Sequence, residues 1–194
     1  MFLNQMRIGP RLSLGFAAVL VLTLVLAAVG TWRLGNAAQA VDEMMSVPLT
    51  KERLVGEWYR NLNVGVRRTA AIAKSGDAGL VAYFAEEMKA STARADAIIK
   101  QLDAMPTSAE EKQLLATIAE RRKAYLALRD AINAAKKDGK ADEATKLFES
   151  RFDATATAYL DSMRAYLEHQ AKTIDALGQG IQADARASRL WMAG

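Results

Sequence analysis

The sequence predicts an all-α protein in which an N-terminal transmembrane helix precedes an antiparallel up-down four-helix bundle. The chain of 194 residues is 51% hydrophobic but only 7% aromatic, and it contains three prolines. Alanine, leucine and methionine supply most of the apolar residues, a composition typical of long helices. A second observation is the uncharged stretch from Leu12 to Trp32. Its length of about 21 residues, at about 1.5 Å rise per residue, matches a hydrocarbon core of about 30 Å.

The charges that flank this stretch predict its orientation. Arg7 and Arg11 precede it without an acidic residue to offset them, so the positive-inside rule places residues 1–11 in the cytoplasm. Residues 33–190 then form an extracytoplasmic domain. A cleaved signal peptide is the alternative, since residues 28–30 resemble a cleavage site, although the apolar run is longer than that of a typical signal peptide.

Proline and glycine positions divide the rest of the chain into helices. Pro48 predicts a kink or a restart, because proline removes an amide donor and disfavours helix at the preceding residue. A helix is expected over residues 49–73, followed by a turn with two glycines over residues 74–79. A second helix is expected over residues 80–105, where Pro106 ends it.

The third helix begins with a predicted capping box and ends at a glycine. Thr107 or Ser108 caps its N-terminus, with a glutamate three positions further on. Gly139 closes the helix, and the fourth helix starts near residue 141 and continues toward the C-terminus. Because the connections are short, we expect consecutive helices to pack antiparallel.

Several classes of protein are excluded or disfavoured. The chain has no cysteine, which excludes disulfide scaffolds, thiolate zinc sites and c-type haem attachment. The formal net charge of +4 is scattered, so nucleic acid is not expected as a partner. The single histidine, His169, has no thiol or second histidine to act with, and it is interpreted as a surface or interface residue rather than a haem ligand. No enzymatic activity, metal or cofactor is expected.

The third helix carries arginines where apolar residues are expected. Its heptad seam includes Arg122, Tyr125 and Arg129. The alternative is that a parallel stripe through Leu128 faces the core and both arginines extend outward. Counting from the turns at about 1.5 Å per residue places polar groups of all four helices in one layer, about 12–27 Å from the tip of the bundle. The candidate ligand-binding residues in this layer are Arg122, Arg129, Tyr159, Ser91, Thr92, Tyr125, Arg68, Arg67, Thr155 and Asn61.

Arginines in this layer require anions, because a buried unpaired charge is costly. Acidic residues near the layer are few: Glu57 and Asp130 are candidates, and Asp96 lies lower. Arginine binds carboxylates in bidentate geometry, and hydroxyl groups can complete such a site. A small carboxylate ligand between the helices is one interpretation. A network of salt bridges between helices is the other, and the residues alone support both.

Three segments near the N-terminus are informative: MRIGPRLSLGF leading into the apolar span, then GTWRLG, then VPLTKERL. They resemble the N-terminal part of bacterial methyl-accepting chemotaxis proteins that have a four-helix-bundle sensor domain. The opening pattern of that family falls on Ile8, Arg11, Leu12, Gly15 and Phe16. An early proline in the first periplasmic helix corresponds to Pro48. The likeness covers essentially the whole chain, through architecture beyond these segments, and related sensor kinases and cyclases share the module.

The resemblance implies a periplasmic sensor that is anchored in the bacterial inner membrane and works as a homodimer or a higher oligomer. Its ligand would be a di- or tricarboxylate such as malate or citrate, or an amino acid, bound in the membrane-distal half. The arrangement is more similar to the carboxylate-sensing branch, and on that likeness Arg122 and Arg129 clamp carboxylates. The residues that would donate hydrogen bonds are Tyr159, Tyr125 and Ser91 or Thr92.

Arg67, Arg68 and Thr155 match the amino-acid-sensing branch of the family only loosely. A complete receptor also has a second membrane span and a cytoplasmic domain that works with kinase and adaptor proteins. Residues 191–194 are interpreted as the start of a truncated second span, so the chain is expected to be the input part of a receptor. Ligand binding is expected to displace the fourth helix relative to the first. A non-sensing anchored structural or adaptor bundle is the alternative.

Overall fold

The computed structural model describes the backbone of residues 8–192, which is helical and contains no strand in that range. The predicted all-α fold class is confirmed. Predictions that concern the side chains of Arg7, Arg11 and residues 191–194 lie outside the described residues. The elements are α1 (Ile8–Lys74), α2 (Leu80–Tyr83), α3 (Ala85–Asp103), α4 (Ala109–Lys137), α5 (Ala141–Leu147), the π-helix η2 (Phe148–Phe152) and α6 (Asp153–Met192).

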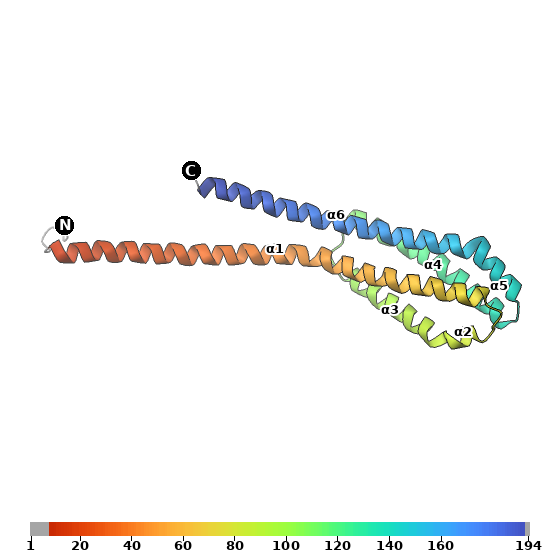
Figure 1. Ribbon diagram of the computed structural model, residues 1–194. Coiled ribbons are helices and arrows are strands. Elements are labelled where there is room, and N and C mark those ends of the chain that lie inside the picture. The colour runs from red at the N-terminus through yellow and green to blue at the C-terminus, as the bar shows by residue number, and fades with distance from the viewer. Residues whose placement is uncertain (1–7, 193–194) are drawn as a thin grey trace. The chain divides into compact units, whose positions relative to one another are not determined.

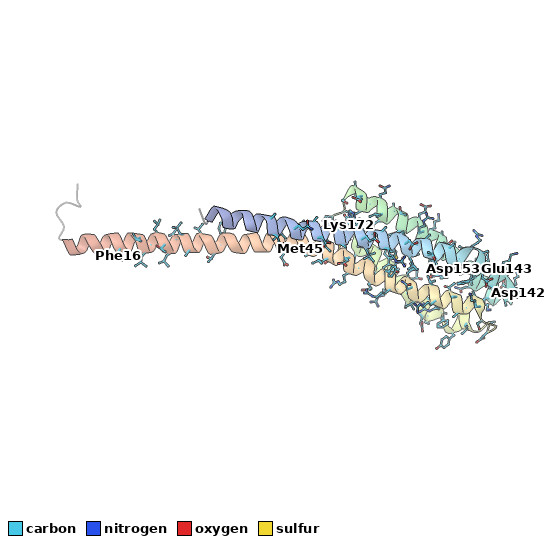
Figure 2. The ribbon with its side chains drawn as sticks, turned by 45° about the horizontal axis from the view of Figure 1, so that its top comes forward. Phe16, Met45, Asp142, Glu143, Asp153 and Lys172 are labelled. Carbon is cyan, nitrogen blue, oxygen red and sulfur yellow. The ribbon has the colours of Figure 1, made fainter. Side chains whose placement is uncertain are left out.

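The chain divides into two compact units, Met1–Met44 and Met45–Gly194, and α1 contributes to both. In the first unit, the stretch Gly15–Trp32 is long and apolar enough to cross a membrane. It falls within the predicted span, and the side chain of Phe16 there is exposed (Figure 2). Within the described residues, no other helix passes the same test of length and composition.

The second unit is the bundle. Figure 1 shows the C-terminal part of α1 running alongside α3, α4 and α6, with the short helices α2 and α5 at one end. Figure 2 labels Asp142 and Glu143 on α5 at that end, and Lys172 on α6 toward the other. The core between the helices is aromatic at its centre. Tyr125 lies 5.2 Å from Phe152 and 5.6 Å from Tyr159, measured between ring centroids.

Two expected interruptions differ from the structure. Helix α1 continues through Pro48, so a restart there is wrong, whereas the alternative of a kink stays a prediction. One proline removes one hydrogen bond, which the rest of a 67-residue helix tolerates. The predicted helix over residues 80–105 is instead divided at Phe84, whose φ of −90° and ψ of 3° leave the α region. The Phe84 ring lies 5.6 Å beneath the Arg68 guanidinium. Helical hydrogen bonds continue on both sides of this local turn.

The predicted ends of α4 are confirmed. The Ser108 hydroxyl accepts a hydrogen bond from the Glu111 amide at 3.1 Å, and the Glu111 carboxylate accepts one from the Ser108 amide at 2.7 Å. Ser108, rather than Thr107, is therefore the N-cap of a complete capping box. At the other end, Gly139 has a φ of +74°, a left-handed conformation that glycine adopts at little cost.

The π-helix η2 was not expected. Its hydrogen bonds, from residue i to i+5, put more residues into each turn than an α-helix has. Phe148, Phe152 and Ala156 are buried at a spacing of four. Ala156, rather than Thr155 of the predicted stripe, is therefore the buried residue at this point of α6.

A buried ion pair joins three helices at the end of the bundle away from α2 and α5. Lys51 of α1 donates to Glu111 of α4 at 2.7 Å, and Gln170 of α6 donates to the same oxygen at 2.6 Å. Lys51 also donates to the Pro106 carbonyl at 2.5 Å. Burial of Glu111 alone would raise its pKa, but the hydrogen bonds from Lys51, the Ser108 amide and Gln170 outweigh it and lower the pKa to about 2.

Candidate functional site

A cavity of about 40 Å³ lies between α1, α3, α4 and α6 of the bundle. Apolar side chains such as Trp58, Leu62 and Leu126 form part of its wall. Its polar lining consists of Asn61, Arg68, Thr69, Ser91, Thr92, Arg122, Tyr125, Arg129 and Tyr159. These lining residues all lie in the described part of the chain, and they include three arginines but no aspartate or glutamate. The wall of the cavity is therefore cationic.

Most of the residues predicted from the sequence meet at this cavity. Eight of the ten line it: Arg122, Arg129, Tyr159, Ser91, Thr92, Tyr125, Arg68 and Asn61. Arg67 does not, because it lies one residue further around α1 and is exposed. Thr155 does not line it either: Ala156 is the buried residue at that level, and the Thr155 hydroxyl donates to the Arg151 carbonyl at 2.9 Å. That the eight residues bind a ligand stays a prediction.

Sequence reasoning did not assign Gly65 and Thr69 to the site, although both lie on the buried stripe of the first helix. Their spacing of four residues places them on one face of the helix, and the sequence alone does not distinguish a packing role from a place in the cavity wall. A Cβ on Gly65 would lie 3.0 Å from the Tyr125 hydroxyl, tighter than most real Cβ contacts, so the phenol would have to move by a few tenths of an ångström. Because Gly65 has no side chain, it leaves room for the phenol of Tyr125.

The two arginines of α4 lie at the border of its buried face, with 20% of the Arg122 side chain and 17% of the Arg129 side chain exposed. Arg122 Nη2 donates to Asp96 Oδ1 at 2.7 Å. Arg129 donates to Asp130 Oδ1 from both Nε and Nη2, at 2.9 and 2.8 Å. Its third nitrogen, Nη1, donates to the Thr92 hydroxyl at 3.2 Å. Both guanidiniums thus reach the cavity while they bond to carboxylates at its edge.

Arg68 of α1 is the most buried of the three arginines, with 10% of its side chain exposed. Its Nη2 donates to Glu87 Oε2 at 2.8 Å. The three acidic partners, Glu87, Asp96 and Asp130, are between 58% and 63% exposed. Of the acidic residues expected near the layer, Asp130 does bond to a cavity arginine, Arg129. Asp96, expected lower, bonds to Arg122, and Glu87 is a partner that the residue count did not name. The expected partner Glu57 bonds to Arg94 instead, at 2.6 Å.

Two tyrosines with neighbouring rings, Tyr125 and Tyr159, line the cavity. Burial raises the pKa of Tyr125, although the nearby Arg129 opposes the shift. Burial likewise raises the pKa of Tyr159, against the opposing effect of Arg122. Both hydroxyls are therefore protonated at neutral pH and can serve as hydrogen-bond donors.

The hydroxyl groups of α3 are already engaged. The Ser91 hydroxyl donates to Asn61 Oδ1 at 2.7 Å, and Asn61 Nδ2 donates to the Ser91 carbonyl at 2.8 Å. The Thr92 hydroxyl donates to the Met88 carbonyl at 2.9 Å and accepts from Arg129. In this state Ser91 and Thr92 position their neighbours, and either would have to rotate in order to donate to a ligand.

The described residues contain no group of three or more His, Asp or Glu side chains that could hold a metal ion. His169 lies at the other end of the bundle, partly exposed, with Nδ1 3.3 Å from Glu110 Oε1. The chemistry available at the cavity is therefore that of guanidinium and phenol donors, which bind anions.

A helical bundle with a cationic cavity between its helices, and with a helix that could cross a membrane, defines the class of helical sensory modules. The family model of the four helix bundle sensory module for signal transduction matches residues 5–185. The chain belongs to this family, a sensory module of methyl-accepting chemotaxis protein signal transduction. The family is sensory rather than catalytic. No curated protein matches the chain in sequence.

Proposed function

We propose that the chain is the input module of a chemoreceptor that binds a small carboxylate in the cavity of its bundle. The ligand class is a di- or tricarboxylate such as malate or citrate, or an amino acid. The observation that carries the proposal is the set of three half-buried arginines, Arg68, Arg122 and Arg129, in a cavity wall without an acidic residue.

Geometry supports a carboxylate over a neutral ligand. Arg68 comes from α1 and the other two arginines from α4, so donors reach the cavity from two helices. Each guanidinium has five N–H groups in a planar fork, and the bonds to Glu87 and Asp96 use one nitrogen each. The phenols of Tyr125 and Tyr159 add neutral donors. Such donor sets match a ligand with two or more carboxylate groups.

We further propose that residues 33–190 form the sensor domain in the periplasm, anchored in the inner membrane by the N-terminal span, and that the module works as a homodimer. Ligand binding would favour one offset of α6 relative to α1. The cavity supports this mechanism because it is lined by Arg68 from α1 and by Tyr159 from α6. In a complete receptor the signal would pass to cytoplasmic kinase and adaptor proteins. The same module could serve a histidine kinase or a cyclase.

A second candidate is a structural or adaptor bundle that senses nothing. The observation in its favour is that all three cavity arginines have a carboxylate partner within the chain. Such a network satisfies the buried guanidiniums without a ligand.

Thermal melting of the purified full chain with malate, citrate, succinate and aspartate separates the two candidates. A ligand at a hundred times its dissociation constant should stabilise the protein by about 2.7 kcal/mol. Arg122→Ala should abolish this stabilisation, whereas Arg121→Ala, which removes an exposed arginine next to it, should not. If no carboxylate shifts the melting temperature, the structural bundle is the better description.

A further inference from the structure

We infer that Asp96 and Asp130 act as internal competitors of the ligand: they hold the cavity arginines in the unliganded state, and a carboxylate ligand displaces them. The inference rests on the proposed function and adds two residues that set the affinity of the site. Neither aspartate lines the cavity itself. Both act from its edge, through Arg122 and Arg129.

The first step of the argument is the unequal burial of each pair. Arg122 and Arg129 are at most one-fifth exposed, whereas Asp96 and Asp130 are more than half exposed. An exposed carboxylate that turns away from its partner is solvated by water, so its release costs little. The arginines, in contrast, need an anion beside them. The aspartates are therefore the exchangeable half of each pair.

The second step concerns the donors that the aspartates occupy. Asp130 Oδ1 accepts hydrogen bonds from both Nε and Nη2 of Arg129. These two nitrogens form the side edge of the guanidinium, which can bind a carboxylate in bidentate geometry. Arg129 Nη1 is bonded to Thr92. A ligand carboxylate can reach this side edge of Arg129 only in place of Asp130. Asp96 occupies a single nitrogen of Arg122, Nη2.

The third step is the space available. A cavity of about 40 Å³ has room for only a few water molecules, so a dicarboxylate requires its edge to open. An open groove between α3 and α4 adjoins the cavity, and the two share Met88, Thr92 and Arg129. Asp96 and Asp130 both line that groove. The two aspartates thus lie at the place where a ligand would pass from solvent into the cavity.

Calorimetric titration of the full chain with succinate and with citrate tests the inference. The proteins are the wild type, Asp96→Asn, Asp130→Asn and the double variant. We expect the affinity to rise about threefold to fivefold in each single variant and about tenfold to twenty-fivefold in the double variant, a range set by the weakness of exposed ion pairs. Glu120→Gln is the matched control, because it removes one exposed negative charge from α4 away from the cavity and should leave the affinity unchanged.

The outcomes separate this inference from the proposed function. Wild-type binding with unchanged or weaker affinity in both aspartate variants overturns the inference and leaves the proposed function intact. An equal gain in Glu120→Gln also overturns it, because general electrostatics would then explain the effect. Binding seen only in the double variant supports it. Absence of binding by all of the proteins overturns both. Melting curves of the variants check that each is folded, and exposed aspartates are expected to leave them within a few degrees of the wild type.

Discussion

Replacing one partner of the buried ion pair of Lys51 and Glu111 should destabilise the bundle more than replacing both partners. In Lys51→Met, the Glu111 carboxylate keeps its buried position and loses its charged partner. Against the opposing effect of burial, Lys51, the Ser108 amide and Gln170 together lower the pKa of Glu111 from 4.5 to about 2, which favours the ionised form by about 3 kcal/mol in total at 1.36 kcal/mol per pKa unit. Measured losses of one partner from buried pairs, about 3–5 kcal/mol, are of the same size. We therefore expect the free energy of unfolding to fall by about 3 kcal/mol.

Urea unfolding of the full chain in detergent, followed by far-ultraviolet circular dichroism, measures this loss. Lys112→Met, which removes an exposed lysine one residue from Glu111, should change the unfolding free energy by less than about 0.5 kcal/mol. Adding Glu111→Gln to Lys51→Met should recover part of the loss, because no buried charge then remains. A loss below about 1 kcal/mol in Lys51→Met would refute the reasoning, since the pair would then contribute no more than an exposed one.

Three further predictions concern pH, the cap of α4 and the glycine in the cavity wall. The pKa of Glu111 is lowered from 4.5 to about 2, so the stabilisation that the ionised carboxylate gives to the fold is complete above about pH 4.5 and is lost as the pH falls through about 2. The urea midpoint of the wild type should drop over this pH range. The midpoint of Lys51→Met should drop much less. Ser108→Ala should lower the unfolding free energy by about 1 kcal/mol through loss of the capping box, and an unchanged urea midpoint would contradict this. Gly65→Ala should weaken carboxylate binding in calorimetry, since the new Cβ would lie 3.0 Å from the Tyr125 hydroxyl. Gly56→Ala, whose Cβ would meet only the end of Arg60 at 3.6 Å, is its control, and equal affinities in the two variants would exclude a role for the close contact.

The helices could be predicted because their determinants are local. The capping box at Ser108 and the left-handed Gly139 depend on a few neighbouring residues, and apolar spacing identifies the buried faces. The division at Phe84 could not be predicted, because it accompanies a contact with Arg68 on another helix. The residues over 148–152 form an ordinary helical sequence that gives no signal for a π-helix.

The height of each candidate residue along the bundle axis could also be predicted, since the rise per residue of an α-helix is fixed. This is why Arg68, Arg122 and Tyr159, which are far apart in the chain, line one cavity. The ion pairs could not be predicted in the same way. Asp96 bonds to Arg122, but which carboxylate an arginine reaches depends on side-chain rotamers as well as on the positions of the Cα atoms.

The π-helix η2 sets the rotation of the whole of α6. If residues 148–152 closed into an α-helix with no residue removed, everything that follows would turn by about 100° and move along the axis by about 1.5 Å. Tyr159 would then leave the cavity, and Gln170, eleven residues further on, would leave Glu111. The cavity and the buried ion pair therefore depend on the same wide turn. Deleting one residue within 148–152 would be tolerated better, because the wide turn could close into an α-helical turn and leave the rotation of α6 unchanged.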